Sequence, residues 1–308
     1  MNKILRFIKE PYRLITSYRF SKIFGRIIPD KLFVKCMYHS FTGKKLDLKN
    51  PKGFNEKLQW LKIYDRKDIY TTIVDKAEAK TWASSIIGDN YIIPTIGVYN
   101  HFDEINFENL PDQFVLKCTH DSAGVIVVKD KAKLNIPEAK KKIEKCLKNN
   151  FFYNGREWPY KNVKPRIIIE QYMEQDNVTS NRDELIDYKF YCFNGEPRFL
   201  YIAQANFING QKNDMLRYLD LDWKDTPFGR PDHLQLDIEI EKPPKFDEMI
   251  SLAKKLSKGI PFVRSDFYFT HGNVYFSELT FFPGSGVGLF SPEEWELEIG
   301  SWINLFPK

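Results

Sequence analysis

Two acidic residues near the end of the chain have the spacing needed to hold a divalent cation together. Residues 262–280 read as two β-strands, and a three-residue loop at 271–273 would place Asp266 directly opposite Glu278. Two carboxylates this close repel each other unless a cation lies between them, and Mg²⁺ is commonly held by such oxygen ligands beside nucleotide phosphates. The hairpin therefore indicates a site for Mg²⁺ and a phosphorylated ligand.

The same register adds an arginine and a hydroxyl to this face. Arg264 would lie opposite Thr280, next to Tyr268 and Phe276, while the alternate side chains point into a core: Val263, Phe267, Phe269, Leu279 and Phe281. A surface pair of acids bridged by Arg264 is the alternative interpretation. A two-residue loop would put the carboxylates on opposite faces, so the prediction depends on the loop length.

Two further predicted hairpins carry lysines. Lys117 lies in the strand 114–118, just before a small polar turn at 119–124 whose backbone N–H groups are suited to phosphates, although turns of this composition join many hairpins. The strand 187–193, which ends in an Asn-Gly turn, places Asp187 and Lys189 on one face. These two charges either pair structurally or face a polar site.

The composition is typical of an ordinary globular protein, whose fold has to position these residues. The chain has 308 residues, 43% of them hydrophobic and 28% charged, with a net charge of +5, which excludes a disordered or fibrous protein and predicts two domains or lobes. We find no apolar run of the ~18 residues that a spanning helix needs, and the charged N-terminus is unlike a signal peptide. The four scattered cysteines suggest reduced thiols. We therefore expect a cytoplasmic protein.

Positive charge is concentrated at the start of the chain. Residues 1–49 contain twelve Lys/Arg and three Asp/Glu, a net charge of +9, interleaved with apolar residues at helical spacing. This basic arm either contacts an anionic membrane surface, at the inner face of the cytoplasmic membrane, or packs on the protein with its lysines in solvent. No recognised motif supports nucleic-acid binding.

Helical and strand-like segments follow in mixed order. Helical spacing of apolar residues covers 55–82, 137–148 and 246–257, and β-rich runs lie between them from residue 91 onward. The strands alternate with helices without a fixed period. This order predicts an α+β protein built on antiparallel hairpins.

The order of these features resembles that of ATP-grasp enzymes. The resemblance is carried by the segments 74–76 (VDK), 114–124 (FVLKCTHDSAG), 167–173 (IIIEQYM), 187–189 (DYK), 264–266 (RSD) and 278–284 (ELTFFPG). Three more segments, 54–60 (FNEKLQW), 154–160 (NGREWPY) and 281–286 (FFPGSG), resemble the TupA-like branch, which is named for teichuronopeptide biosynthesis. The resemblance extends from about residue 50 to the C-terminus.

The resemblance implies an ATP-grasp fold, in which two α+β lobes enclose a nucleotide. We divide the chain accordingly into a basic helical arm (1–50), a helical entry and N-terminal lobe (51–113), a small lid lobe (114–173) and a large catalytic lobe (174–308).

The resemblance also implies roles for individual residues. ATP would be contacted by Lys76, Lys117, Thr119, Ser122, Gly124, Glu170, Tyr172, Met173 and, among three candidate ribose-binding acids, Asp176. Mg²⁺ would be ligated by Asp266, Glu278 and Thr280, and the transferred phosphate would be steadied by Arg264 and Lys189. Thr280 departs from the family pattern, which usually has a metal-binding Asn there, and Ala123 stands where relatives often have Gly.

The implied activity is that of a carboxylate–amine ligase using ATP and Mg²⁺ through an acyl phosphate. The branch is associated with bacterial surface polysaccharides, so we expect a uronic acid carboxylate, on a glycan or on a lipid-linked or nucleotide-linked precursor, joined to an amino acid or small amine. Aromatic side chains at 151–160 either stack on sugars or pack in the core.

Two other classes of function compete with this expectation. The leading alternative is a glycosyltransferase, because Asp220 and Asp222 form a DxD that could hold a sugar nucleotide through a metal. A non-catalytic nucleotide-binding module is the third possibility, although it would have no physical need for so many charges facing one site.

Overall fold

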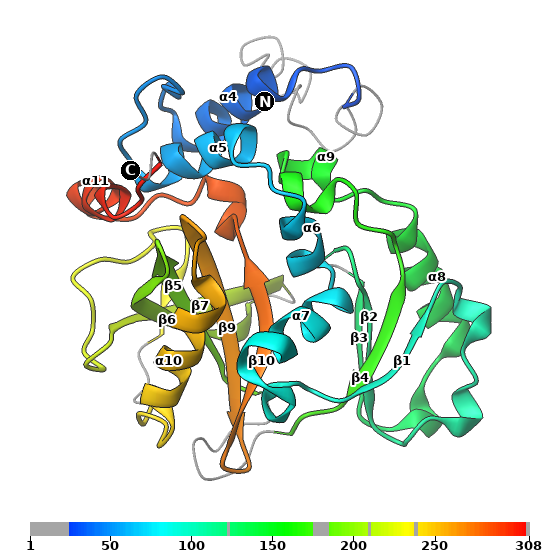
Figure 1. Cartoon of the computed structure of the whole chain (residues 1–308). Helices are drawn as coiled ribbons and strands as arrows, with labels where there is room; N and C mark the ends of the chain where they lie inside the picture. The colour runs from blue at the N-terminus through cyan, green and yellow to red at the C-terminus, as the bar shows by residue number, and fades with distance from the viewer. Residues whose placement is uncertain (1–24, 122–123, 175–184, 209–210, 237–239, 306–308) are drawn as a thin grey trace.

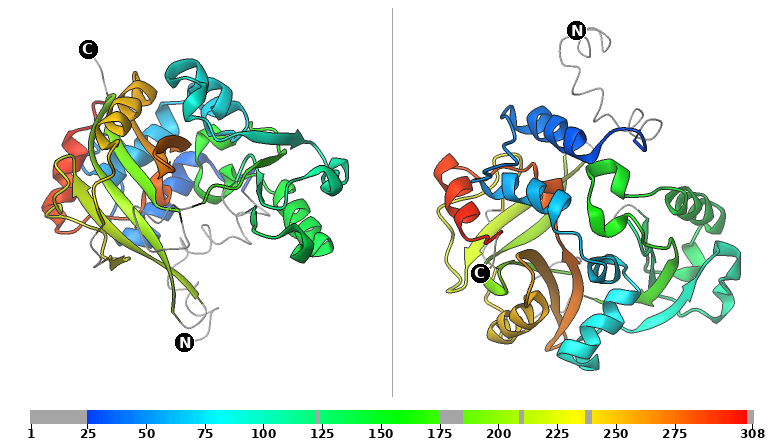
Figure 2. Two further views of the ribbon diagram at one scale, coloured as in Figure 1. Left: turned by 90° about the horizontal axis from the view of Figure 1, so that it is seen from below. Right: turned by 45° about the horizontal axis from the view of Figure 1, so that its top comes forward.

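The computed structural model describes residues 25–121, 124–174, 185–208, 211–236 and 240–305. They form two sheets, antiparallel except for the short parallel pair of β7 and β8, with helices packed on and between them, the α+β architecture expected from the sequence (Figure 1). The two sheets lie in separate halves of the molecule, as the turned views also show (Figure 2).

The smaller sheet has four strands in the order β1-β4-β2-β3. They are β1 (Thr95–Tyr99), β2 (Phe114–Cys118), β3 (Val125–Val128) and β4 (Ile167–Gln171). Alternation in β2 buries Phe114, Leu116 and Cys118 against the helix α8 (Ile136–Leu147), so Lys117 points to the opposite face.

One predicted boundary cuts through this sheet. Strand β1 pairs with β4, from Thr95 opposite Glu170 to Tyr99 opposite Ile167, although the sequence analysis assigned it to the segment 51–113. The division at residue 113/114 is therefore wrong for β1, because strand pairing over about 70 positions leaves no local signal in the sequence.

The larger sheet has six strands in the order β10-β9-β5-β6-β7-β8. They are β5 (Asp187–Phe193), β6 (Glu196–Ile208), β7 (Gln211–Asp220), β8 (Leu234–Gln235), β9 (Phe262–Thr270) and β10 (Asn273–Thr280). The amphipathic helix α10 (Phe246–Ser257) covers one face and buries Phe246, Met249 and Leu252 in the main core. The opposite face of the sheet carries Lys189 and Asp266 side by side.

The remaining helices connect and brace the two sheets. They are α4 (Asp30–Thr42), α5 (Phe54–Tyr64), α6 (Ile69–Val74), α7 (Glu78–Ile87), α9 (Phe152–Gly155) and α11 (Glu293–Ser301), with short 3₁₀ turns at Asp89–Tyr91, Phe102–Glu104, Phe107–Asn109, Lys131–Lys133, Trp158–Tyr160 and Pro283–Gly286. No helix among the described residues is long and apolar enough to cross a bilayer.

Helix α4 forms part of the basic arm. Its apolar face is buried through Phe33, Val34, Met37 and Tyr38, so within residues 30–42 the arm is a helix packed on the protein. Residues 1–24 of the arm lie outside the described part of the chain.

The hairpin that carries the two carboxylates has a shorter loop than predicted. His271 and Gly272 form a two-residue loop, both at positive φ (50° and 71°). A β-bulge between Phe276 and Glu278 then adds one residue, which restores Glu278 to its place opposite Asp266. The expected three-residue loop is therefore wrong, and the expected pairing of the carboxylates is confirmed.

The bulge also changes which aromatic residue lies near the carboxylates. Phe276 pairs with Phe267 and is only 2% exposed in the core, whereas Tyr275 lies opposite Tyr268. The expectation that Phe276 shares the face of Asp266 is wrong, because the register shift falls between it and Glu278.

The packing of α11 on the start of α5 gives a stability prediction. A Cβ at Gly300 would lie 2.2 Å from the carbonyl oxygen of Lys52, so Gly300→Ala forces the two backbones apart. We expect this variant to lose about 3 kcal/mol in the free energy of unfolding, measured by urea denaturation. The exposed neighbour on the same helix, Ser301→Ala, is the control and should lose much less. Equal losses would contradict the close packing.

Candidate active site

Arg264 is the centre of the group on β9 and β10. Its Nε and Nη2 donate to Asp266 Oδ1 and Oδ2 at 2.7 and 2.5 Å, and Nη2 also reaches Glu278 Oε1 at 3.2 Å and Thr280 Oγ1 at 2.9 Å. Its Nη1 donates to the Tyr201 hydroxyl at 3.0 Å. The bidentate contact with Asp266 sets the orientation of the guanidinium.

Lys189 completes this group from the neighbouring strand. Its ammonium contacts Asp266 Oδ2 at 2.8 Å and also pairs with Asp187. Although burial acts in the opposite direction, the charges of Asp187 and Asp266 hold the pKa of Lys189 well above its usual value. Lys189 therefore keeps its charge at every working pH.

A second charged group lies on the smaller sheet. Glu170 of β4 pairs with Lys117 of β2 through Oε2 at 2.6 Å and with Lys80 of α7 through Oε1 at 2.6 Å. Burial would raise the pKa of Glu170, but the two lysines lower it below its usual value. Glu170 thus fixes two cations on the face of the sheet opposite its core.

Lys76 connects the helices to the polar turn after β2. Its Nζ donates to the carbonyl oxygen of Asp121 at 2.7 Å, and its backbone N–H donates to Thr119 at 3.0 Å. Arg166 holds the preceding Asp75 at 2.9 Å. Lys76 is therefore positioned by the turn itself.

The turn is closely packed. The Asp121 carboxylate accepts a hydrogen bond from the Gly124 N–H at 2.9 Å, and a Cβ at Gly124 would lie 2.6 Å from Cys118 Sγ, so the position excludes a side chain. The Thr119 side chain is buried and donates to the carbonyl oxygen of Lys164 at 3.4 Å. Ser122 lies outside the described residues.

The two groups converge on Glu278. Burial would raise the pKa of this carboxyl, but four cations lower it to about 2, in the order Lys76, Arg264, Lys189 and Lys117. Lys117 comes from the smaller sheet, Lys76 from the link between α6 and α7, and the other two from the larger sheet. Both halves of the molecule therefore direct positive charge to one place.

This arrangement fits a metal–nucleotide. The carboxylates of Asp266 and Glu278 and the hydroxyl of Thr280 are the hard oxygen donors that Mg²⁺ prefers. Each carboxylate oxygen has two lone pairs, so Asp266 can accept a further contact beside those from Arg264 and Lys189. The surrounding cations suit phosphate oxygens.

The family comparison agrees with this chemistry. The model of one protein family, described as TupA-like ATPgrasp, matches residues 56–304. The chain belongs to the TupA-like ATP-grasp family. Its cofactors are accordingly ATP and Mg²⁺, and the fold is the ATP-grasp fold expected from the sequence. A comparison with curated proteins found no match.

Solved structures of ATP-grasp ligases are similar to this ATP-grasp chain at low identity. The D-alanine–D-alanine ligase of Helicobacter pylori matches with 16% identity and a TM-score of 0.41, over 81% of this chain and 69% of its own. The corresponding ligase of Bacillus anthracis matches with 17% identity and a TM-score of 0.39, over 76% and 66%. The ligase PsnB, complexed with a minimal precursor, matches with 11% identity and a TM-score of 0.39, over 69% of this chain and 54% of its own.

The structure brings together most residues that the sequence analysis assigned to the ATP-grasp site, and their individual roles stay predictions. Tyr172 and Met173 directly follow β4 and are half-buried, next in the chain to the Glu170 group. Asp176 lies outside the described residues.

Two residues that contact the charged groups, Lys80 and Tyr201, were not among the predicted site residues. Lys80 follows Lys76 by four positions, one helical turn, which was an available signal. The pair of Asp187 and Lys189, one of the two alternatives expected from their strand, is confirmed. Tyr201 lies on a different strand from Arg264, and only the pairing of β6 with β5 brings it near.

The DxD segment has a local structural role. Asp220 Oδ1 accepts hydrogen bonds from the backbone N–H groups of Asp222 at 2.9 Å and Lys224 at 2.8 Å, which closes the turn after β7. The Asp222 side chain is 81% exposed. The two carboxylates therefore do not form a shared metal site in this turn.

The aromatic residues at 151–160 pack mainly against the protein. Phe152 is 2% exposed, and the Arg156 guanidinium lies over its ring at 5.3 Å and over that of Phe33 at 4.3 Å. Phe151 and Tyr160 contact each other edge to face at 4.9 Å. Packing thus accounts for these residues better than stacking on sugars.

The lowered pKa of Glu278 gives a prediction about acid stability. Its pKa falls from about 4.3 in the unfolded chain to about 2 in the folded protein, so its ionisation stabilises the fold above about pH 4.5 and this contribution is lost as the pH falls toward 2. The difference in unfolding free energy between wild type and Glu278→Gln should therefore be largest near pH 7 and shrink below about pH 4.5, measured by urea denaturation.

The control for this series is a surface acid. Glu293 pairs with Lys44 at 2.6 Å but is 74% exposed, so Glu293→Gln should differ little from wild type at any pH. A Glu278→Gln difference that stays constant from pH 7 to pH 3 would contradict the charge balance described above.

Proposed function

We propose that the protein is an ATP- and Mg²⁺-dependent carboxylate–amine ligase. A substrate carboxylate oxygen attacks the γ-phosphate of ATP, which forms an acyl phosphate and releases ADP. The nitrogen of an amine then attacks the acyl carbon, the bond from carbon to the phosphate oxygen breaks, and phosphate and a proton leave as the amide forms.

The observation that carries the proposal is the set of contacts on Asp266, which holds Arg264 at 2.5 Å and Lys189 at 2.8 Å opposite Glu278. Phosphoryl transfer depends on positioning and on neutralising charge more than on covalent help from the protein. Mg²⁺, held by Asp266 and Glu278, would neutralise further negative charge on the phosphates. Arg264, held by Asp266, would steady the transferred phosphate and the oxyanion of the amide-forming step.

The side chains near this site also favour a reaction without a protein nucleophile. The cysteine closest to the polar turn, Cys118, is buried, and burial raises the pKa of its thiol, which opposes a reactive thiolate. His120 is 2% exposed, and its Nε2 lies 3.1 Å from the carbonyl oxygens of Cys146 and Asn149. Both side chains are thus buried in the packing around the smaller sheet.

The proposed substrate is inferred from the resemblance to the TupA-like branch and not from the geometry of the site. The resemblance to the teichuronopeptide branch supports a uronic acid carboxylate, on a glycan or on a lipid-linked or nucleotide-linked precursor, and an amino acid or small amine as acceptor. We propose these as the reactants of the ligase.

The ligand specificity can be tested by thermal unfolding. A ligand present at ~100 times its dissociation constant adds about 2.7 kcal/mol of stability, so Mg²⁺ with ATP should raise the midpoint of wild type by several degrees. Glu278→Ala should lose most of this shift, while Asp222→Ala, in the exposed turn after β7, should keep it. Release of ADP on adding glucuronic acid and an amine would then identify the ligase.

Two results would contradict the proposal. A shift with Mg²⁺ and a UDP-sugar but none with ATP would favour the glycosyltransferase. ATP binding without ADP release in the presence of any uronic acid and amine would contradict the proposed reactants.

The basic arm adds a proposal about location. The net charge of residues 1–49 supports contact with anionic lipid, which would place the enzyme near membrane-bound precursors at the inner face of the cytoplasmic membrane. Because α4 is already packed on the protein, we expect deletion of residues 1–24 to abolish flotation with anionic vesicles. Neutral vesicles are the control, and flotation that survives the deletion would remove the support.

A further inference from the structure

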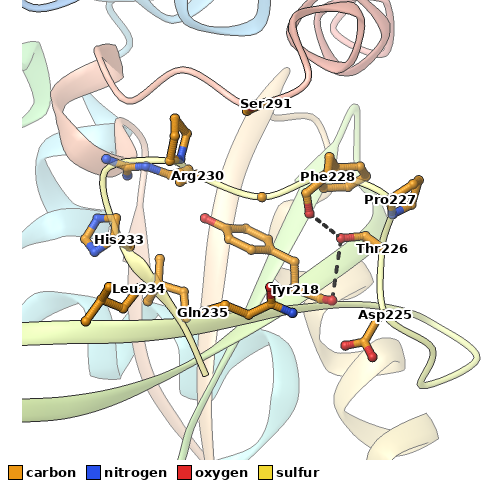
Figure 3. Close-up of a pocket in the computed structure, with 13 residues that line it drawn as sticks. Tyr218, Asp225, Thr226, Pro227, Phe228, Arg230, His233, Leu234, Gln235 and Ser291 are labelled. Carbon is orange, nitrogen blue, oxygen red and sulfur yellow. Dashed lines mark hydrogen bonds between the residues drawn. The ribbon is translucent and has the colours of Figure 1, made fainter. Parts of the chain in front are cut away.

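A pocket of about 400 Å³ lies at the far side of the larger sheet from β10. It is lined by β7, β8, the loop between them and Ser291 (Figure 3). Its volume is in the range of small-molecule sites. None of the residues assigned above to ATP, Mg²⁺ or the transferred phosphate lines it.

The pocket opens on the same face of the sheet as the reacting groups. Arg264 donates to the Tyr201 hydroxyl at 3.0 Å, and the Tyr201 ring lies 5.3 Å from that of Tyr218, which lines the pocket. Three strand spacings separate β9 from β7, or about 14 Å. A single layer of tyrosines therefore connects Arg264 to the pocket.

The loop around the pocket is well ordered by its own contacts. Thr226 donates from its N–H to the Tyr218 carbonyl at 3.1 Å and from its hydroxyl to the Phe228 carbonyl at 2.8 Å. Gly229 and Ser291 exchange two backbone hydrogen bonds at 3.1 and 2.9 Å. The pocket is thus preformed, which lowers the entropic cost of binding a ligand.

Charges around the pocket are balanced, unlike those around Glu278. Arg230 pairs with Asp232, with Nε 3.0 Å from Oδ1, and Arg217 pairs with Asp225 at 2.7 and 3.0 Å. A pocket with neutralised cations gives little preference to a phosphate or polyanion. It suits neutral polar groups instead.

One polar group lacks a partner. Tyr218 is 6% exposed, and its hydroxyl is buried without a hydrogen bond; Figure 3 shows it pointing toward Arg230. A buried hydroxyl left unpaired costs about 1–3 kcal/mol, so a ligand that supplies the partner gains by doing so. Gln235, His233 and Thr226 add further polar atoms among apolar ones from Pro227 and Pro231.

We propose that this pocket binds the neutral sugar residues of an extended substrate whose uronic acid carboxylate is activated at Arg264. The mixture of hydroxyl, amide and aliphatic surfaces matches the hydroxyl groups and apolar ring faces of a pyranose. The separation of about 14 Å selects a ligand of more than one sugar unit. The inference rests on the proposed function for the identity of the reacting carboxylate.

Gly229 allows the pocket to be filled without touching the reacting groups. A Cβ at this position would meet only the Tyr218 ring, at 3.8 Å, an ordinary contact. Gly229→Leu should therefore fold and fill the pocket, and retention of the thermal shift with Mg²⁺ and ATP checks that it does. Lys224→Ala changes an exposed side chain of the same loop and is the matched control.

The experiment is a titration with a disaccharide of glucuronic acid and a neutral hexose, in the presence of Mg²⁺ and a non-hydrolysable ATP analogue. We expect Gly229→Leu to weaken disaccharide binding at least tenfold, Gln235→Ala to weaken it several-fold, and Lys224→Ala to leave it unchanged. Unchanged affinity in Gly229→Leu would overturn the proposal, as would an equal loss of affinity in Gly229→Leu and Lys224→Ala.

Failure of this inference is distinguishable from failure of the ligase. If wild type releases no ADP with any uronic acid, but Gly229→Leu binds the disaccharide more weakly than wild type does, the pocket proposal stands and the proposed reaction is wrong. If ADP is released equally well by wild type and Gly229→Leu with the disaccharide, the reaction stands and the pocket is overturned.

Discussion

The structure depends on keeping several cations close together in a folded protein. Lys76, Lys117, Lys189 and Arg264 would repel one another if no acid lay among them. Asp266 and Glu170 each hold two cations, and Glu278 lies where all four fields overlap. The acids thus offset the repulsion between the cations when no phosphate is bound. The group as a whole still attracts a phosphate.

The two sheets position these charges through the alternation of side chains along their strands. Antiparallel strands place every second side chain on one face, so β5 and β9 present Lys189 and Asp266 together, while alternate residues of the same strands enter the aromatic core. The smaller sheet repeats the arrangement with Lys117 and Glu170. Each half therefore uses the core on one face to orient charges on the other.

The helices at the start of the chain brace the region behind the site. Lys62 of α5 is fully buried and donates to the carbonyl oxygens of Gly155 and Ser285, both at 2.8 Å. Burial lowers the pKa of Lys62 to about 8 and raises that of the nearby Glu157, which accepts a hydrogen bond from the Ser285 hydroxyl. These contacts join α5 to the end of α9 and to the turn that follows Thr280. The segments 154–160 and 281–286, which carry part of the family resemblance, meet here.

The sequence by itself determined the fold class, the family and most of the charged residues of the site, because strand alternation, Asn-Gly turns and the order of short motifs are local features. Only the tertiary structure decided three things. The bulge beside Ser277 restored the pairing of Asp266 with Glu278 after a two-residue loop. The pairing of β1 with β4 moved a strand into the smaller sheet. The approach of Lys80 to Glu170 and of Tyr201 to Arg264 joined elements that are distant in the chain. All three depend on contacts between distant residues or on a one-residue irregularity, and neither leaves a periodic signal in the sequence.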